Sequence, residues 1–115
     1  MIIAIDFDGT IAKTEYPKII EPIPGAIRTI KDLYDDGHDL ILWTLREKEN
    51  LEIATIWMYQ RGIDDFFSEI NKNLPKHIEK WESDPRKIAA DIYIDDRSIG
   101  WTGWKAVRDY FCLGD

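Results

Sequence analysis

The chain begins with a short, unbroken apolar run that acidic residues follow directly. Residues 2–5 are apolar and mostly β-branched, and Asp6, Asp8 and Gly9 come after them. Unbroken apolar runs of this length are typical of strands buried on both faces of a parallel sheet. In open sheets of this kind, ligands bind outside the carboxyl ends of the strands. The first ten residues therefore predict a core strand that carries two carboxylates to a binding edge.

The rest of the chain alternates between strand and helix patterns. We expect further strands at 39–44, 66–70 and 91–96, and helices between Gly25 and Gly37, at 47–61, near 77–81 and in the tail after Arg97. This alternation predicts an α/β fold, a doubly wound three-layer sandwich with a central parallel sheet. If the first strand lies between those at 39–44 and 91–96, the strand order reverses beside it, which creates a ligand site.

Length and spacing predict one domain. At 115 residues the chain has an ordinary single-domain size, so we assign residues 1–115 to one unit. The polar, proline-bearing segment 11–24 is interpreted as a flap over the first strand. No segment is long enough to fold separately as a cap domain.

Composition excludes several classes of protein. The net charge of -7 argues against a nucleic-acid-binding surface, which would be basic. A single cysteine, Cys112, permits no internal disulfide and fits a reducing compartment. No apolar stretch has membrane-spanning length and no signal peptide is evident, so we expect no membrane association and a cytoplasmic location. Trp101 and Trp104 could form a self-association patch, which leaves a homo-oligomer open.

Polar residues follow three of the expected strands. Asp6 and Asp8 follow the first, Thr44 the second, and Asp95 and Asp96 the last. The carboxyl ends of parallel strands share one edge, so these side chains are expected to meet. Crowded carboxylates repel one another, and a divalent cation relieves the repulsion. Mg²⁺ prefers a few carboxylate oxygens together with water and substrate phosphate. The sequence thus predicts a magnesium–phosphate site.

Four segments resemble the motifs of the haloacid dehalogenase (HAD) superfamily of phosphohydrolases. Residues 6–10, Asp-Phe-Asp-Gly-Thr, resemble motif I, and Thr44 after an apolar strand resembles motif II. Lys87 resembles the lysine of motif III, and residues 94–96, Ile-Asp-Asp, resemble motif IV. The ordered set is more specific than any single motif. The absence of a cap-sized insertion makes the small capless members the best match.

The resemblance implies a role for each residue. Asp6 would be the nucleophile that forms an aspartyl-phosphate, and Asp8 would protonate the leaving oxygen and then activate water. Thr44 and Lys87 would complete the catalytic set by holding the phosphoryl group and neutralising its charge. The implied substrate-binding residues are Thr10, Thr44, Leu45, Arg46 and Lys87, and Thr10 would also orient the motif I loop. The implied Mg²⁺ ligands are Asp6, Asp8 through its carbonyl, Asp95 and Asp96.

The positive charges of the site leave alternatives open. Many HAD members have a proline after the motif III lysine, whereas Ile88 follows Lys87. Lys72 and Lys76 lie in the same connection and compete with Lys87 for the role. Arg46 could grip substrate or be solvated. Arg97 could contact substrate or form a structural ion pair.

The expected activity is Mg²⁺-dependent hydrolysis of a phosphate monoester. The substrate could be a nucleotide, a sugar phosphate or a phosphorylated macromolecule. Two other classes compete: a phosphate- or metal-binding regulatory module without turnover, and a phosphotransferase. A receiver domain also clusters acids, Thr and Lys on a parallel sheet, but its phosphate-accepting Asp lies on a later strand. Asp-x-Asp after the first strand fits the hydrolase order better.

Overall fold

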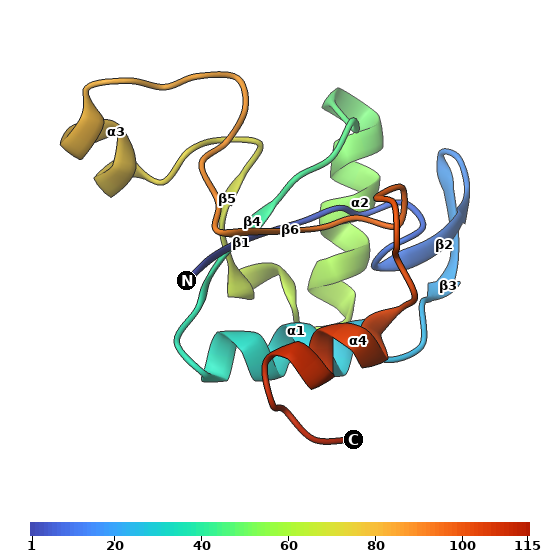
Figure 1. Ribbon diagram of the computed structural model, residues 1–115. Coiled ribbons are helices and arrows are strands. Elements are labelled where there is room, and N and C mark those ends of the chain that lie inside the picture. The colour runs from blue at the N-terminus through green and yellow to red at the C-terminus, as the bar shows by residue number, and fades with distance from the viewer.

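A parallel sheet in the order β5-β4-β1-β6 lies at the centre of the protein (Figure 1). The computed structural model describes residues 1–115. The strands are β1 (Ile2–Ile5), β4 (Asp39–Leu42), β5 (Phe67–Ile70) and β6 (Ile92–Ile94). β1 pairs in parallel with β4 on one side and with β6 on the other. β1 therefore meets the condition considered from the sequence, because it lies between β4 and β6 and the strand order reverses beside it.

The helices cover the two faces of the sheet unequally. They are α1 (Ala26–Asp35), α2 (Lys48–Gln60), α3 (Pro75–Trp81) and α4 (Trp104–Tyr110), with a short 3-10 helix η1 (Asp64–Phe66) before β5. Alternate side chains of a strand point to opposite faces. Ile3 and Ile5 accordingly join the main core with residues of α1, α2 and α4. Ala4 joins a smaller cluster with Leu74 and Ile88 on the other face.

Helix α1 illustrates how the sequence specifies this packing. Its buried residues, Ala26, Thr29, Ile30 and Leu33, recur at helical spacing and form one stripe against the core. α4 packs against α1, and Figure 1 shows the two helices side by side. The tail helix, expected on the sheet, therefore reaches the core beside α1, through the buried Trp104.

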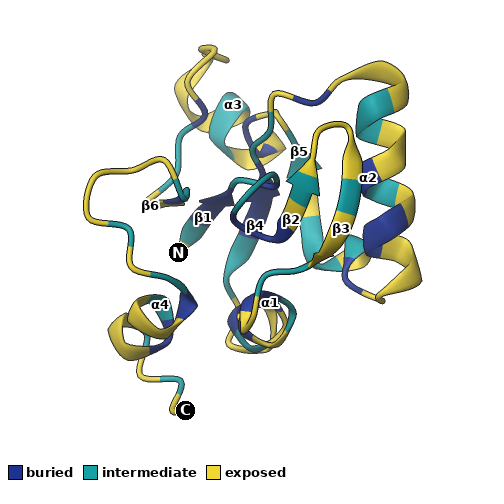
Figure 2. Cartoon of the chain, turned by 90° about the vertical axis from the view of Figure 1, so that its right-hand side faces the viewer, coloured by how far each residue is buried: buried dark blue, intermediate teal, exposed yellow.

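The segment 11–24, predicted to be a flap, forms an antiparallel hairpin. Its strands are β2 (Ala12–Glu15) and β3 (Lys18–Pro22), which form a second small sheet. Figure 2 shows the hairpin standing beside α2, with exposed residues at its tip and a buried base. The hairpin is thus an ordered element that begins directly after the first strand's acidic loop.

Two expected strands are shorter than predicted. β4 ends at Leu42 and β6 at Ile94, so Thr44, Asp95 and Asp96 lie beyond the ladder. Because these residues lie outside the hydrogen-bonded strands, their side chains can turn toward one another instead of alternating between the two faces of the sheet. None of the helices is both long and apolar enough to cross a membrane.

Candidate functional site

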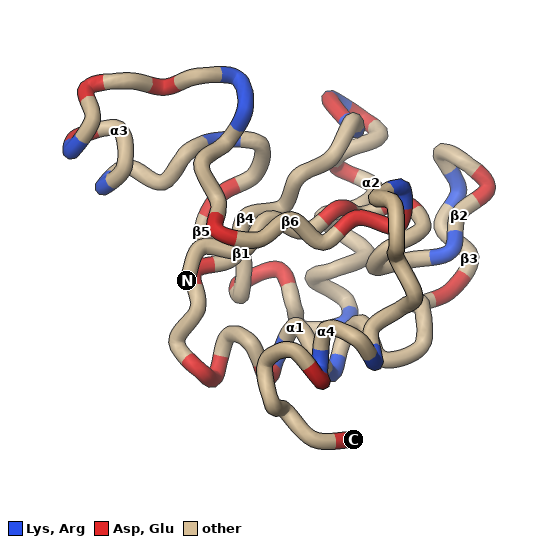
Figure 3. Tube along the Cα trace, viewed as in Figure 1, with Lys and Arg blue, Asp and Glu red and all other residues tan.

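A cleft of about 550 Å³ lies at the carboxyl ends of β1, β4 and β6. It is lined by Asp6, Asp8, Gly9, Thr14, Tyr16, Trp43, Thr44, Leu45, Asp95, Asp96 and Arg97. Figure 3 shows the acidic stretches that follow β1 and β6 running side by side. The predicted meeting of Asp6, Asp8, Thr44, Asp95 and Asp96 at one edge is therefore observed.

Three carboxylates form the centre of the cleft. Asp6, Asp95 and Asp96 each offer an oxygen, and these oxygens lie within 4.8 Å of one another. The pKa of Asp6 is raised from 3.8 to about 7, first by burial and then by the negative charges of Asp95 and Asp96, while a hydrogen bond from Thr10 lowers it. The electrostatics favour either a proton or a cation at this point.

Thr10 connects the two acidic loops, which follow β1 and β6, from the buried side of the cleft. Its side chain is completely buried, and its Oγ1 lies 3.0 Å from Asp6 Oδ2 and accepts the Asp96 N–H at 2.8 Å. Trp104 Nε1 donates to the Thr10 carbonyl at 2.8 Å. The prediction that Thr10 binds substrate is wrong, because no surface of it reaches the cleft. Its contacts orient the acidic loops.

Gly9 is required by both conformation and space. Its φ is +83°, in the left-handed region that side chains disfavour. A Cβ at this position would lie 2.4 Å from Asp96 Oδ2. The Asp-Gly pair after β1 therefore permits the close approach of the β6 loop.

Thr44 is held in the cleft by a residue that the sequence analysis did not identify. Asn71 Oδ1 accepts the Thr44 N–H at 2.8 Å, and Asn71 Nδ2 donates to the Thr44 carbonyl at 2.9 Å. Asn71 directly follows β5 and has a φ of 55°, a conformation that Asn tolerates better than most residues. In the sequence, the only signal for this role was a single Asn directly after an expected strand.

Leu45 also lies at the predicted position, on the cleft rim. The residue is 93% exposed, and its backbone N–H has no acceptor within the protein. The Thr44 hydroxyl and this free amide are suited to bind an anionic oxygen together.

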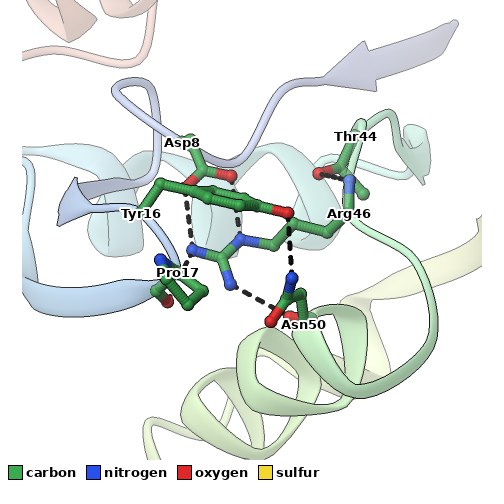
Figure 4. Close-up of polar contacts among 6 residues, drawn as sticks. All are labelled: Asp8, Tyr16, Pro17, Thr44, Arg46 and Asn50. Atoms are coloured by element: carbon green, nitrogen blue, oxygen red, sulfur yellow. Dashed lines mark hydrogen bonds and ion pairs between the residues drawn. The ribbon is translucent and has the colours of Figure 1, made fainter.

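Arg46 is not free to bind substrate. Only 1% of the residue is exposed, and its guanidinium donates to both Asp8 oxygens, from Nε at 2.9 Å and from Nη2 at 2.8 Å (Figure 4). Its remaining contacts are the carbonyls of Asn50 at 3.0 Å and Pro17 at 3.0 Å. The predicted substrate-binding role of Arg46 is therefore wrong, as is the alternative that it is solvated.

The structure does not bring Lys87 to the cleft. Lys87 precedes β6, and the amino end of a parallel strand lies at the edge opposite its carboxyl end. Its Nζ lies over the Tyr93 ring, 5.6 Å from the centroid. Lys76 pairs with Asp39 at the amino end of β4, at 2.8 Å. Lys72 is exposed just beyond the carboxyl end of β5, without lining the cleft.

The cation that lines the cleft is Arg97. It is exposed and makes no ion pair within the protein. From the sequence, Arg97 could either contact substrate or form a structural ion pair. The second interpretation is wrong.

The chain has a relative of known structure. A conserved protein from Bacteroides thetaiotaomicron shares 41% of its sequence, and the alignment covers 98% of this chain and 90% of that one, with a TM-score of 0.85. The chain belongs to the family of this conserved Bacteroides protein. The family therefore has the Rossmann-like α/β fold described above. The sequence matches no established family model and no curated protein.

Proposed function

We propose that this protein is a Mg²⁺-dependent phosphohydrolase of the HAD type, with a doubly wound fold and no cap domain. The observation that carries the proposal is the convergence of Asp6, Asp95 and Asp96 within 4.8 Å, in one cleft with Asp8 and Thr44. Acids at two strand ends, beside a hydroxyl and a free amide, fit a phosphate ester and a cation better than a neutral ligand.

The donor set fits Mg²⁺. Three carboxylates offer oxygens close together, and the raised pKa of Asp6 reflects its burial and then repulsion from Asp95 and Asp96, both of which a bound divalent cation would offset. Asp6, Asp95 and Asp96 would hold the ion, with the Asp8 carbonyl as the expected fourth ligand. When bound, the ion supplies positive charge for the phosphoryl oxygens.

The chain's own residues then divide the reaction into two steps. Asp6 Oδ attacks phosphorus, the bond from phosphorus to the leaving oxygen breaks, and Asp8 gives that oxygen its proton. Water next attacks the phosphorus of the aspartyl-phosphate, and Asp8 takes the proton of the water. The bond from Asp6 to phosphorus breaks, which restores the Asp6 carboxylate and releases inorganic phosphate.

Positive charge for the phosphate is assigned to Arg97 and Lys72. Arg97 lines the cleft. Lys72 follows the carboxyl end of β5, which is the binding edge of a parallel sheet. The motif III role therefore moves from Lys87 to Lys72, one of the alternatives left open by the sequence. The substrate class remains a phosphate monoester of a nucleotide, a sugar or a macromolecule.

The test is hydrolysis of p-nitrophenyl phosphate with Mg²⁺ or with EDTA, by the wild-type protein and Asp6→Asn. We expect metal-dependent turnover that Asp6→Asn lowers at least about a thousandfold. Asp36→Asn, an exposed carboxylate at the end of α1, is the matched control and should retain full activity.

A phosphorylated protein species should also be trapped by acid quenching and located on Asp6 by mass spectrometry. Full activity in Asp6→Asn would contradict the proposal. Binding of BeF₃⁻ and Mg²⁺ without hydrolysis of any ester tested would favour the non-catalytic module instead.

A further inference from the structure

Arg46 is the one fully buried cation at the edge of the cleft. Its side chain has no exposed surface, whereas 28% of the Asp8 side chain is exposed. An arginine cannot lose its charge or accept a hydrogen bond, so its burial requires acceptors on most of its N–H groups. Asp8 and the carbonyls of Asn50 and Pro17 supply them.

The bidentate contact from the Arg46 guanidinium occupies only one edge of the Asp8 carboxylate. A carboxylate has about four lone-pair sites on its two oxygens, and Arg46 occupies one on each oxygen. Asp8 also lines the cleft, so its other edge remains available there. A planar bidentate contact fixes the rotation of the carboxylate as well as its position, which a single point charge cannot do.

The guanidinium is itself held in a socket built from three elements. Its carbon lies 5.3 Å from the centroid of the Phe7 ring and 4.9 Å from that of Tyr16. Figure 4 shows the Tyr16 ring lying across it, and the Tyr16 hydroxyl accepts from Asn50 Nδ2 at 3.1 Å. Tyr16 and Pro17 form the turn of the hairpin, and Asn50 lies in the first turn of α2. The hairpin thus completes the socket.

We infer that Arg46 is a positioning residue that fixes the Asp8 carboxyl group for proton transfer, from a socket completed by the hairpin. The inference rests on the proposed hydrolase function. Arg46 does not touch the substrate; it acts through Asp8. Its removal should therefore slow the cleavage of esters whose leaving oxygen needs a proton. Cleavage of esters whose leaving oxygen departs readily as an anion should be nearly unaffected.

The experiment compares kcat/KM for an alkyl phosphate and for p-nitrophenyl phosphate. This ratio reports only the steps up to departure of the leaving group, and an alkoxide needs protonation far more than a nitrophenolate. Arg46→Lys keeps the positive charge but loses the bidentate contact with Asp8. We expect kcat/KM to fall about 30-fold or more on the alkyl ester and about threefold or less on the aryl ester.

A double-mutant cycle assigns the effect to Asp8. In an Asp8→Asn background, Arg46→Lys should change kcat/KM on either ester less than twofold, because no proton donor remains to be positioned. Arg61→Lys is the matched control, since Arg61 also lies over an aromatic ring, Trp57, at 3.9 Å, outside the cleft. It should leave both rates unchanged.

Tyr16→Leu is the second variant if Arg46→Lys does not fold. Tyr16 is 57% exposed, so its replacement opens the socket without removing core. Any effect on substrate binding cancels in the ratio of the two esters, and a selective loss on the alkyl ester is again expected. Equal losses on both esters, or additive losses with Asp8→Asn, would overturn the inference alone. No hydrolysis by the wild-type protein would overturn it together with the proposed function.

Discussion

At the scale of single residues, the site depends on positions that do no chemistry. Thr10 joins the loops after β1 and β6 through Asp6 and Asp96, and Asn71 holds Thr44 by both of its backbone groups. Each contact holds a residue of the cleft in place through a neighbouring group of the protein. The acids and the hydroxyl are thus preorganised before any ligand arrives.

Gly9→Ala is expected to damage the acidic centre specifically. The new Cβ would collide with Asp96 Oδ2, so Asp96 must move away, and the positive φ adds strain of about 1–2 kcal/mol. We expect at least about a tenfold weaker Mg²⁺ affinity, measured by titration calorimetry.

Gly37→Ala is the control for that strain. Gly37 has a φ of +88°, and a Cβ there would meet no atom within 4 Å. It should lose similar stability in urea unfolding while keeping Mg²⁺ affinity. Equal Mg²⁺ affinity in the two variants would show that the Gly9–Asp96 approach does not matter.

At the scale of elements, strand direction decides which charges reach the cleft. Residues just after β1, β4, β5 and β6 lie toward the binding edge, and residues just before a strand lie toward the other edge. Lys87 precedes β6 and lies over Tyr93, whereas Lys72 comes two residues after β5. Both lysines are exposed.

Lys72→Met and Lys87→Met test this difference directly. We expect Lys72→Met to lower kcat/KM for p-nitrophenyl phosphate about 10- to 100-fold, because the positive charge that we propose for the binding edge is lost. Lys87→Met should change it less than about twofold. The reverse result would restore the original motif III prediction and would require the segment before β6 to approach the cleft in solution.

At the scale of the whole molecule, the acidic cleft costs stability when no cation is present. The pKa of Asp6 is raised from 3.8 to about 7, so between these values the folded protein holds a proton that the unfolded chain releases. The stability associated with this group is complete below pH 3.8 and is lost as the pH rises through 7. The proposed function, which needs an ionised Asp6, and the stability of the fold therefore make opposite demands on this residue.

The expected consequence is a melting temperature that falls from pH 5 to pH 8 in EDTA. After allowance for partial solvation of Asp6, the loss is about 1–2 kcal/mol, or about 3–8 °C. Mg²⁺ should restore stability at pH 8 and do little at pH 5, because it binds the ionised carboxylate. Differential scanning fluorimetry measures all four conditions.

Asp6→Asn provides the reference for that measurement. It cannot titrate, so its melting temperature in EDTA should vary less with pH and exceed that of the wild-type protein at pH 8. A wild-type curve parallel to that of Asp6→Asn would refute the raised pKa of Asp6.

Much of the fold was predictable because buried strands and helices carry local signals. The run at 2–5 forms β1, the strand expected at 39–44 forms β4 over Asp39–Leu42, and Gly37 and Gly62 follow the first two helices. The polar residues after the strands could be assigned to one edge, since parallel strands share their direction. The pairs Asp6–Asp8 and Asp95–Asp96 were found for this reason.

The sequence by itself indicated the strands, their shared direction and the gathering of acids at their carboxyl ends, because periodicity and strand direction are local properties of the chain. Only the tertiary structure decided what each charge does. Arg46, Lys87 and Asn71 are all polar residues near a strand, and nothing local separates them. Arg46 is buried against Asp8, Lys87 lies over Tyr93, and Asn71 binds Thr44. The pairings of Arg46 and Asn71 join residues 38 and 27 positions apart in the chain, so burial and distance, rather than residue type, determine their roles.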